Sequence, residues 1–212
     1  MKRLKIPTTE EMQTALQDLV SWYSHSNIQD IEEYVVKLRS QNPGITDDDL
    51  AKKIVNRKAW KCGLIGAATG IPGGLALPVT IPANIVGCWR VQIITAVAIA
   101  KVYGHTAEST DLKTDIFLIL AGEAAKESLK RAGIEVGKSV TKKAVDKFVT
   151  REVMKKIWKI IPQKIITKAG EKSLFSFMKM VPLVGAPIGF AFDWPAALFV
   201  GNTAIKYYSG RG

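Results

Sequence analysis

The chain has 212 residues, enough for one domain with a sizeable core or for one domain with a small appendage. Its net charge of +11 favours an anionic partner, either nucleic acid or an acidic membrane surface. Cys62 and Cys88 form no C-x-x-C motif and have no histidine nearby, which argues against a disulfide framework, a bound metal or another cofactor. The N-terminal MKRLKIPTTEEM lacks the apolar run of a secretory signal, so we expect a cytoplasmic protein.

The first part of the chain has helical periodicity. Thr8 and Glu11 have the spacing of a capping box and precede apolar residues that recur every three or four positions. A second periodic stretch follows Asn27, its predicted cap, and ends at an NPG turn. The two stretches predict a helical hairpin over residues 1–45. A third helix should begin after Thr46, with three Asp in its first turn, where the helix dipole favours them.

Two apolar segments broken by Gly and Pro follow. Residues 62–100 carry one charge, Arg90, and residues 180–205 carry one charge, Asp193. A bilayer-spanning helix needs about 20 consecutive apolar residues, and the stretches free of both Pro and charge are much shorter, so a simple transmembrane span is not expected.

Helical patterns continue through the rest of the chain. The predicted helices end near Gly70, extend from about Pro82 to Tyr103, and cover residues 109–131 as one helix; two more follow in the basic region, split at Pro162. No alternating pattern has turn signals that would make a hairpin of strands. We therefore predict an all-α protein, a single multi-helix bundle with Gly/Pro-broken apolar segments.

The glycines of the apolar segments allow two interpretations. Five of them sit four apart: Gly66, Gly70 and Gly74, and again Gly185 and Gly189. Such spacing permits close helix contacts in a soluble bundle. It also suits a re-entrant, membrane-inserting pair of segments or the walls of an apolar cavity.

The stretch AGIEVGKS, residues 132–139, fits a relaxed phosphate-loop pattern with Lys138 in the lysine position. A working phosphate loop follows a buried strand, whereas the residues before this one have helical periodicity. Gly133 and Gly137 also make an ordinary pair of small residues at helical spacing. We therefore do not expect a nucleotide to bind.

The positive charge is concentrated in one region. Residues 126–172 contain 14 Lys or Arg and 5 Asp or Glu, a net of +9 out of the total of +11. Basic residues recur there every four positions: Lys143, Lys147, Arg151, Lys155 and Lys159. One interpretation is a core-packing helix with a solvated cationic face. The other is a helix against anionic lipid headgroups, with Trp158 near the interface. Nucleic acid fits less well because the aromatic residues fall mainly on the apolar side.

The placement of Gly, Pro and aromatic residues resembles the EcsC family of bacterial proteins. The similarity is carried by a Gly-rich apolar run closing on a Pro, an apolar helix ending IAKVYG, and the terminal VPLVGAPIGFAFDWPAALFVGNTAIKYY. It covers roughly residues 46–212 and leaves the first hairpin out. The resemblance implies a family similar to a protein encoded beside ABC-transporter components, whose members associate with membranes. It implies no catalytic residue.

Two further side-chain sets are candidates for sites. His105, with Glu123 on the neighbouring helix, is the only evident acid–base pair, and neither residue lies in a catalytic motif. Arg90 and Asp193 are the single charges of the two apolar segments and have opposite signs, so they are predicted to meet as a buried ion pair. Asp193 capping its own helix, and Arg90 reaching solvent along its apolar stem, are the alternatives.

The sequence thus favours a non-catalytic, membrane-associated helical accessory protein, peripheral to the cytoplasmic side of the membrane. Its predicted partner is an anionic membrane surface or a membrane protein, contacted through the basic region. The alternative is a hydrolase-like enzyme of unknown substrate in the same helical fold.

Overall fold

The computed structural model describes residues 8–25, 28–69, 83–105, 109–131, 134, 140–157, 159, 162 and 185–210. Every regular element within these residues is a helix, which confirms the all-α fold class. The helices are α1 (Thr9–His25), α2 (Ile28–Ser40), α3 (Asp47–Thr69), α4 (Ala83–Val102), α5 (Ser109–Ala121), α6 (Glu123–Arg131), α7 (Lys142–Phe148) and α9 (Gly185–Ser209), and residues 151–157 form a further helical stretch.

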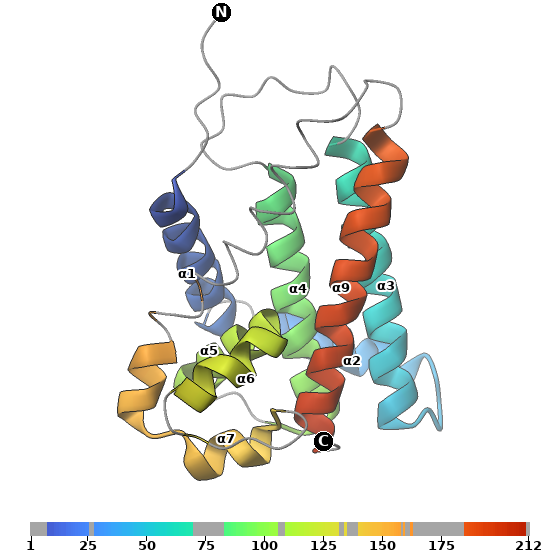
Figure 1. Ribbon diagram of the computed structural model, residues 1–212. Helices are drawn as coiled ribbons and strands as arrows, with labels where there is room; N and C mark the ends of the chain where they lie inside the picture. The colour runs from blue at the N-terminus through green and yellow to red at the C-terminus, as the bar shows by residue number, and fades with distance from the viewer. Residues whose placement is uncertain are drawn as a thin grey trace, which may run out of the picture.

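Three long helices form the centre of the molecule. α3, α4 and α9 run side by side, with α3 antiparallel to the other two (Figure 1). The most extensive contact in the fold is between α3 and α9. Five consecutive residues of α4, Ala96 to Ala100, are almost completely buried, so other helices enclose α4 on all sides at this level. This explains why α4 has an apolar sequence without a clear polar face.

Glycines allow α3 and α9 to approach closely. Gly201 on α9 faces Val55 on α3, and a Cβ atom at position 201 would lie 2.5 Å from Val55 Cγ1. Gly63 on α3 faces the ring of Phe190, and a Cβ there would lie 2.7 Å from Cε2. Each helix therefore receives a side chain of the other at a position where only hydrogen fits.

The N-terminal helices are capped as the sequence predicts. The Thr8 amide donates to Glu11 Oε2 (2.8 Å) and the Glu11 amide donates to Thr8 Oγ1 (3.1 Å), which is the reciprocal pattern of a capping box. Thr46 Oγ1 accepts from the Asp49 amide (3.2 Å) at the start of α3. The predicted cap at Asn27 lies outside the described residues.

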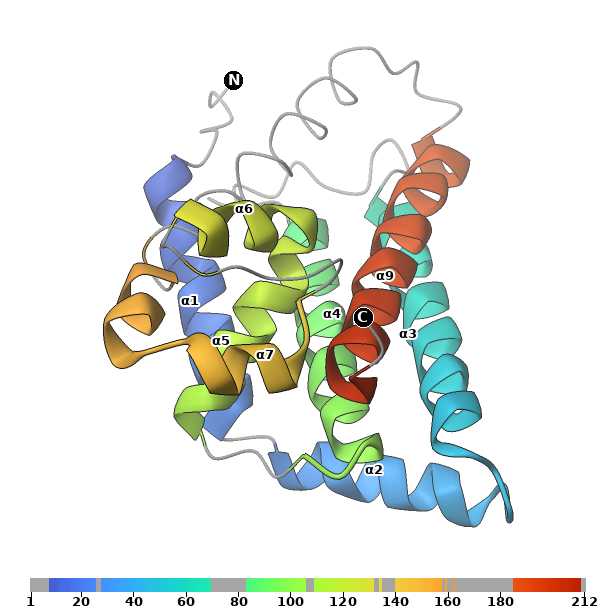
Figure 2. The same cartoon turned by 60° about the horizontal axis from the view of Figure 1, so that its bottom comes forward.

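α1 and α2 do not pack as a simple hairpin. α2 lies across the end of α4 (Figure 2), and each of the two helices packs on α4 more than on the other. Buried residues of both helices, such as Leu16 and Leu38, belong to the same core cluster as Ile54, Ile99 and Phe117. The predicted division near residue 45 therefore does not separate two hydrophobic cores.

The helix predicted over residues 109–131 is divided in two. Gly122 has φ = +55° and separates α5 from α6. The Phe199 ring from α9 covers this position, and a Cβ at 122 would lie 2.7 Å from its Cε1 atom. Both the left-handed backbone and the aromatic contact require glycine. Helical periodicity does not reveal the break, because the apolar pattern continues across this residue.

The apolar segments are described in part. Their helical boundaries agree closely with the prediction, since α3 ends at Thr69 and α4 begins at Ala83. Within the described ranges one window, Ile85–Val102, is long and apolar enough to cross a membrane, although most of it is buried among other helices, as in the core of a soluble protein. Most of the phosphate-loop-like stretch, residues 132–139, lies outside the described residues. So do the surroundings of the four-apart glycines other than Gly66.

The α3–α9 contact gives the first prediction. Gly201→Ala should lower the free energy of unfolding by about 1–3 kcal/mol, because a methyl group would collide with the stiff, β-branched Val55. Chemical denaturation measures this change, and Asn202→Ala, at the adjacent exposed position, should change stability by about 0.5 kcal/mol or less. The double variant Val55→Ala with Gly201→Ala should lose less stability than the sum of the losses in the two single variants, because the smaller side chain leaves room for the methyl group. Strictly additive losses would contradict the close contact.

Candidate functional site

The basic segment, residues 142–157, forms two short helices instead of one long one. Val149 leaves α7 in an extended conformation (φ −91°, ψ 106°). Thr150 then caps the next helical stretch, because its Oγ1 accepts from the Val153 amide (3.4 Å). The prediction of a continuous helix broken only at Pro162 is therefore wrong. A Thr side chain at a cap position and the β-branched Val before it favour this break, and the four-residue spacing of the charges hides it.

The predicted lipid-contacting side chains are on the outside of these two helices. The side chains of Lys143, Lys147, Arg151, Lys155 and Lys159 are all exposed and are together called the basic surface below. Phe148 is 48 % exposed, and Lys147 Nζ lies 5.1 Å from the centroid of its ring. Trp158 lies outside the described residues. The break at Val149 divides the basic surface into two parts, so the charges do not form one ridge along a single helix.

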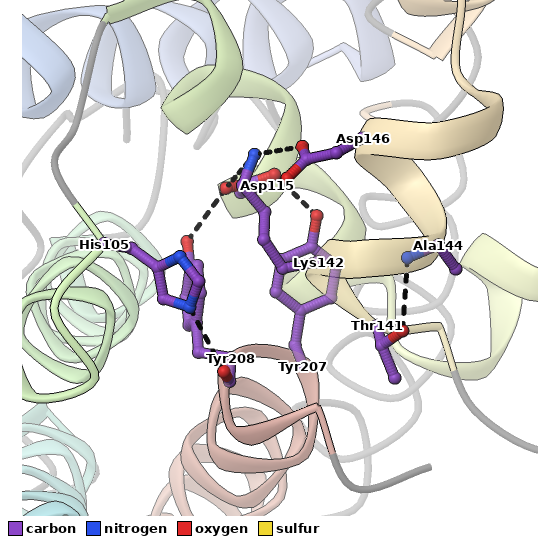
Figure 3. Close-up of polar contacts among 8 residues, drawn as sticks. All are labelled: His105, Asp115, Thr141, Lys142, Ala144, Asp146, Tyr207 and Tyr208. Atoms are coloured by element: carbon purple, nitrogen blue, oxygen red, sulfur yellow. Dashed lines mark hydrogen bonds and ion pairs between the residues drawn. The ribbon is translucent and has the colours of Figure 1, made fainter.

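The inner side of α7 covers a polar cluster. The Tyr207 hydroxyl, from α9, donates to Asp115 Oδ1 on α5 (2.5 Å), and the Tyr208 hydroxyl donates to Asp115 Oδ2 (3.3 Å). Lys142 Nζ, from α7, lies 3.4 Å from Asp115 Oδ2 and 2.6 Å from Asp146 Oδ1 (Figure 3). These five residues, called the Asp115 cluster, join three elements that are far apart in the sequence.

Burial determines the acidity of the cluster. The Asp115 side chain is 4 % exposed and that of Lys142 is 13 % exposed. Burial raises the pKa of the Asp115 carboxyl from 3.8 to about 6, and the Lys142 ammonium and the Tyr207 hydroxyl partly oppose this rise. Burial also raises the pKa of the Tyr207 hydroxyl well above its usual value. The cluster therefore contains a carboxyl that titrates near neutrality beside a phenol that stays protonated.

A cavity adjoins the cluster. Its volume is about 200 Å³, and it lies between α5 and α7. Its lining residues are Thr114, Asp115, Lys142, Val145, Asp146, Val149 and Met154. One part of the wall is charged and the other is apolar.

His105 is placed by backbone contacts. Its Nε2 donates to the carbonyl oxygen of Tyr208 (3.1 Å), and its ring lies 5.0 Å from the Tyr208 ring. Glu123, considered as its acid–base partner, is exposed and pairs with Lys126 instead (3.0 Å). The described contacts of His105 therefore stabilise the end of α9 beside the Asp115 cluster.

The predicted buried ion pair is wrong, because Arg90 is exposed. Its guanidinium carbon lies 6.0 Å and 5.7 Å from the ring centroids of Trp22 and Tyr23 on α1. Asp193 is half-buried and lies well inside α9, which begins at Gly185, so it does not cap that helix either. Burial raises the pKa of its carboxyl, and the nearby Cys88 thiol partly opposes this rise. The long Arg90 side chain reaches solvent along its apolar stem, as the alternative interpretation allows.

Sequence reasoning missed the Asp115 cluster. The four-residue spacing of Lys142 and Asp146 is one local signal, since it places both side chains on one helical face. Asp115 in the apolar run DIFLIL is the second clue, because a lone carboxylate there requires buried partners. Tyr207 and Tyr208 are brought to it only by the tertiary fold. Among the described residues no group of three or more His, Cys, Asp or Glu side chains is arranged to hold a metal ion.

The Asp115 carboxyl predicts a pH dependence of stability. Its folded-state pKa is raised, so its favourable contribution is complete at acid pH and is lost as the pH rises from about 4 through 6. Relative to wild type, Asp115→Asn should therefore gain about 2 kcal/mol in free energy of unfolding between pH 4 and pH 7.5. Denaturant titrations at both pH values measure this difference.

An exposed carboxyl provides the matched control. The pKa of Glu152 is lowered by its own backbone amide and by the Thr150 hydroxyl, so its contribution is lost as the pH falls. Glu152→Gln should therefore shift in the opposite direction to Asp115→Asn. A stability difference for Asp115→Asn that is the same at both pH values would show that the pKa of this carboxyl is not raised in the folded protein.

The comparison with known proteins identifies a family for this chain. The model of the EcsC protein family matches residues 6–212, so the similarity also includes α1 and α2, which the sequence resemblance left out. No curated protein and no solved structure matches the chain. The match covers nearly the whole sequence, and the chain belongs to the EcsC protein family.

Proposed function

We propose that this EcsC family protein is a non-catalytic accessory protein that associates with the cytoplasmic side of a membrane. The basic surface, with five exposed cations beside the exposed Phe148, is the observation that supports this function. Anionic headgroups attract such a group of Lys and Arg, and an aromatic ring next to it suits the interfacial region of a bilayer.

The attachment of the basic surface to the core supports the proposal. Val145 of α7 and Ile157 of the following stretch are buried, so each short helix is fixed by an apolar contact while its cations face solvent. Both views place the two helices on the outside of the bundle, away from α3 (Figures 1 and 2). A flat anionic surface can approach this side without displacing a core helix. A membrane protein with an acidic surface is the other partner of this chemistry.

A hydrolase of the same fold is the alternative function. The Asp115 cluster is the described group that resembles a reactive site, since it contains a carboxyl with a pKa of about 6. Tyr207 is a poor nucleophile, because its side chain is buried and burial raises the pKa of its hydroxyl well above the usual value. The contacts of the cluster connect helices instead of activating an attacking atom, which favours the non-catalytic function.

Membrane binding gives the third prediction. The protein should bind vesicles that contain phosphatidylglycerol, and changing Lys143, Lys147, Arg151 and Lys155 to Gln should reduce this binding strongly. At on the order of 1 kcal/mol per cation, four changes correspond to roughly a thousandfold loss at low salt. Raising the ionic strength should weaken binding of the wild type. Vesicle flotation measures both effects.

A variant with the same change in net charge is the control. Lys37, Lys52, Lys61 and Lys206 are exposed on α2, α3 and α9, and their replacement by Gln should reduce binding much less. Equal losses in the two variants would mean that only the net charge matters. Unchanged binding in the first variant would exclude the basic surface as the contact.

A further inference from the structure

The cavity beside the Asp115 cluster contains more negative than positive side-chain charge. Asp115 and Asp146 line it together with a single cation, Lys142. Lys142 Nζ lies 2.6 Å from Asp146 and 3.4 Å from Asp115, so one cation is shared between two carboxylates. With both carboxylates ionised the lining carries one net negative charge. Such a charge next to a cavity is stabilised by an additional cation.

The two oxygens of Asp115 are not held equally. Oδ1 accepts a short hydrogen bond of 2.5 Å from the Tyr207 hydroxyl. Oδ2 has longer contacts, 3.3 Å to the Tyr208 hydroxyl and 3.4 Å to Lys142 Nζ (Figure 3). Contacts of this length are weak compared with a charge-assisted hydrogen bond of about 2.8 Å. Oδ2 can therefore form a stronger bond to a donor that enters the cavity.

The remaining wall of the cavity is apolar. Val145, Val149 and Met154 line it, all from the two short helices of the basic segment. Its volume of about 200 Å³ suits a small molecule and not a macromolecular segment. An occupant should therefore combine a charged end with a short hydrocarbon part.

We propose that this cavity binds a primary ammonium group joined to a short apolar chain. The ammonium donates to Asp115 Oδ2 and to Asp146, and the chain packs on Val145, Val149 and Met154. Binding of an anionic group is disfavoured, because it would be repelled by the two carboxylates. The one cation, Lys142, is already in contact with both of them. This inference is independent of the proposed membrane contact, because the cavity lies on the inner side of α7 and the basic surface lies on the outer side.

Binding should depend on the ionisation of Asp115. The groups that face this carboxyl are Lys142 and Asp146 from α7 and Tyr207 and Tyr208 from α9. An ammonium guest prefers the carboxylate form, and burial raises the pKa of Asp115 to about 6. Affinity should therefore be highest above pH 7 and should fall as the pH decreases through 6.

The test uses the full chain and three six-carbon probes: n-hexylammonium, hexanoate and 1-hexanol. Calorimetry at pH 7.5 should show saturable binding of hexylammonium, and affinities at least tenfold lower for the other two probes. Asp146→Asn, at an exposed position that folding tolerates, should weaken hexylammonium binding about tenfold or more, as should Asp115→Asn or a change to pH 5. Glu152→Gln, on the exposed side of the next helix, should leave the affinity unchanged.

Equal affinity for hexanoate overturns the proposal, as does an affinity for hexylammonium that Asp146→Asn does not change. The same chemical group occurs in free amines and in phosphatidylethanolamine. Net-neutral vesicles with and without this lipid distinguish the sources, because the basic surface responds equally to both. Preferential binding to the ethanolamine vesicles assigns a lipid headgroup, and hexylammonium binding without this preference assigns a free amine. Absence of saturable binding to any amine probe overturns the proposal, whatever the result for acidic vesicles.

Discussion

The burial of the Asp115 carboxyl constrains the whole side of the molecule that carries the basic segment. A carboxylate that is 4 % exposed needs hydrogen-bond donors, and they come from α7 and from the last turn of α9. Without Lys142 and the two tyrosines, the desolvation cost of this group would be uncompensated. The positions of α7 and of the C-terminal end of α9 are therefore linked through one side chain of α5.

The packing of α3 against α9 makes this link possible. Gly201 and Gly63 let the two helices approach closely, and α4 packs against both of them. Tyr207 and Tyr208 lie less than two turns beyond Gly201 on the same rigid helix, so the α3–α9 contact determines where their hydroxyls point. Apolar packing along α9 thus positions the polar groups of its last turn.

Local features of the fold are predictable from the sequence, and the contacts between distant segments are not. The capping box of Thr8 and Glu11 is confirmed because its two partners are three residues apart and need no tertiary contact. The break at Gly122 depends on Phe199, and the partners of Asp115 come from two other helices, so helical periodicity does not indicate either. The predicted pair of Arg90 and Asp193 does not form because the long arginine stem gives the guanidinium an exit to solvent, which opposite charges in two apolar segments do not reveal.

The sequence KKAVDK of α7 explains how one short helix has two different faces. Lys142 and Asp146 are four residues apart and lie on the inner face, where they contact each other. Lys143 and Lys147 have the same spacing, shifted by one residue, and both are exposed. A rotation of α7 by one residue would bring Lys143 and Lys147 to the inner face in place of Lys142 and Asp146. It would also expose Val145, the buried residue that anchors the helix. The buried carboxylate and the apolar anchor therefore fix the rotation of α7, and this rotation directs the remaining lysines outward.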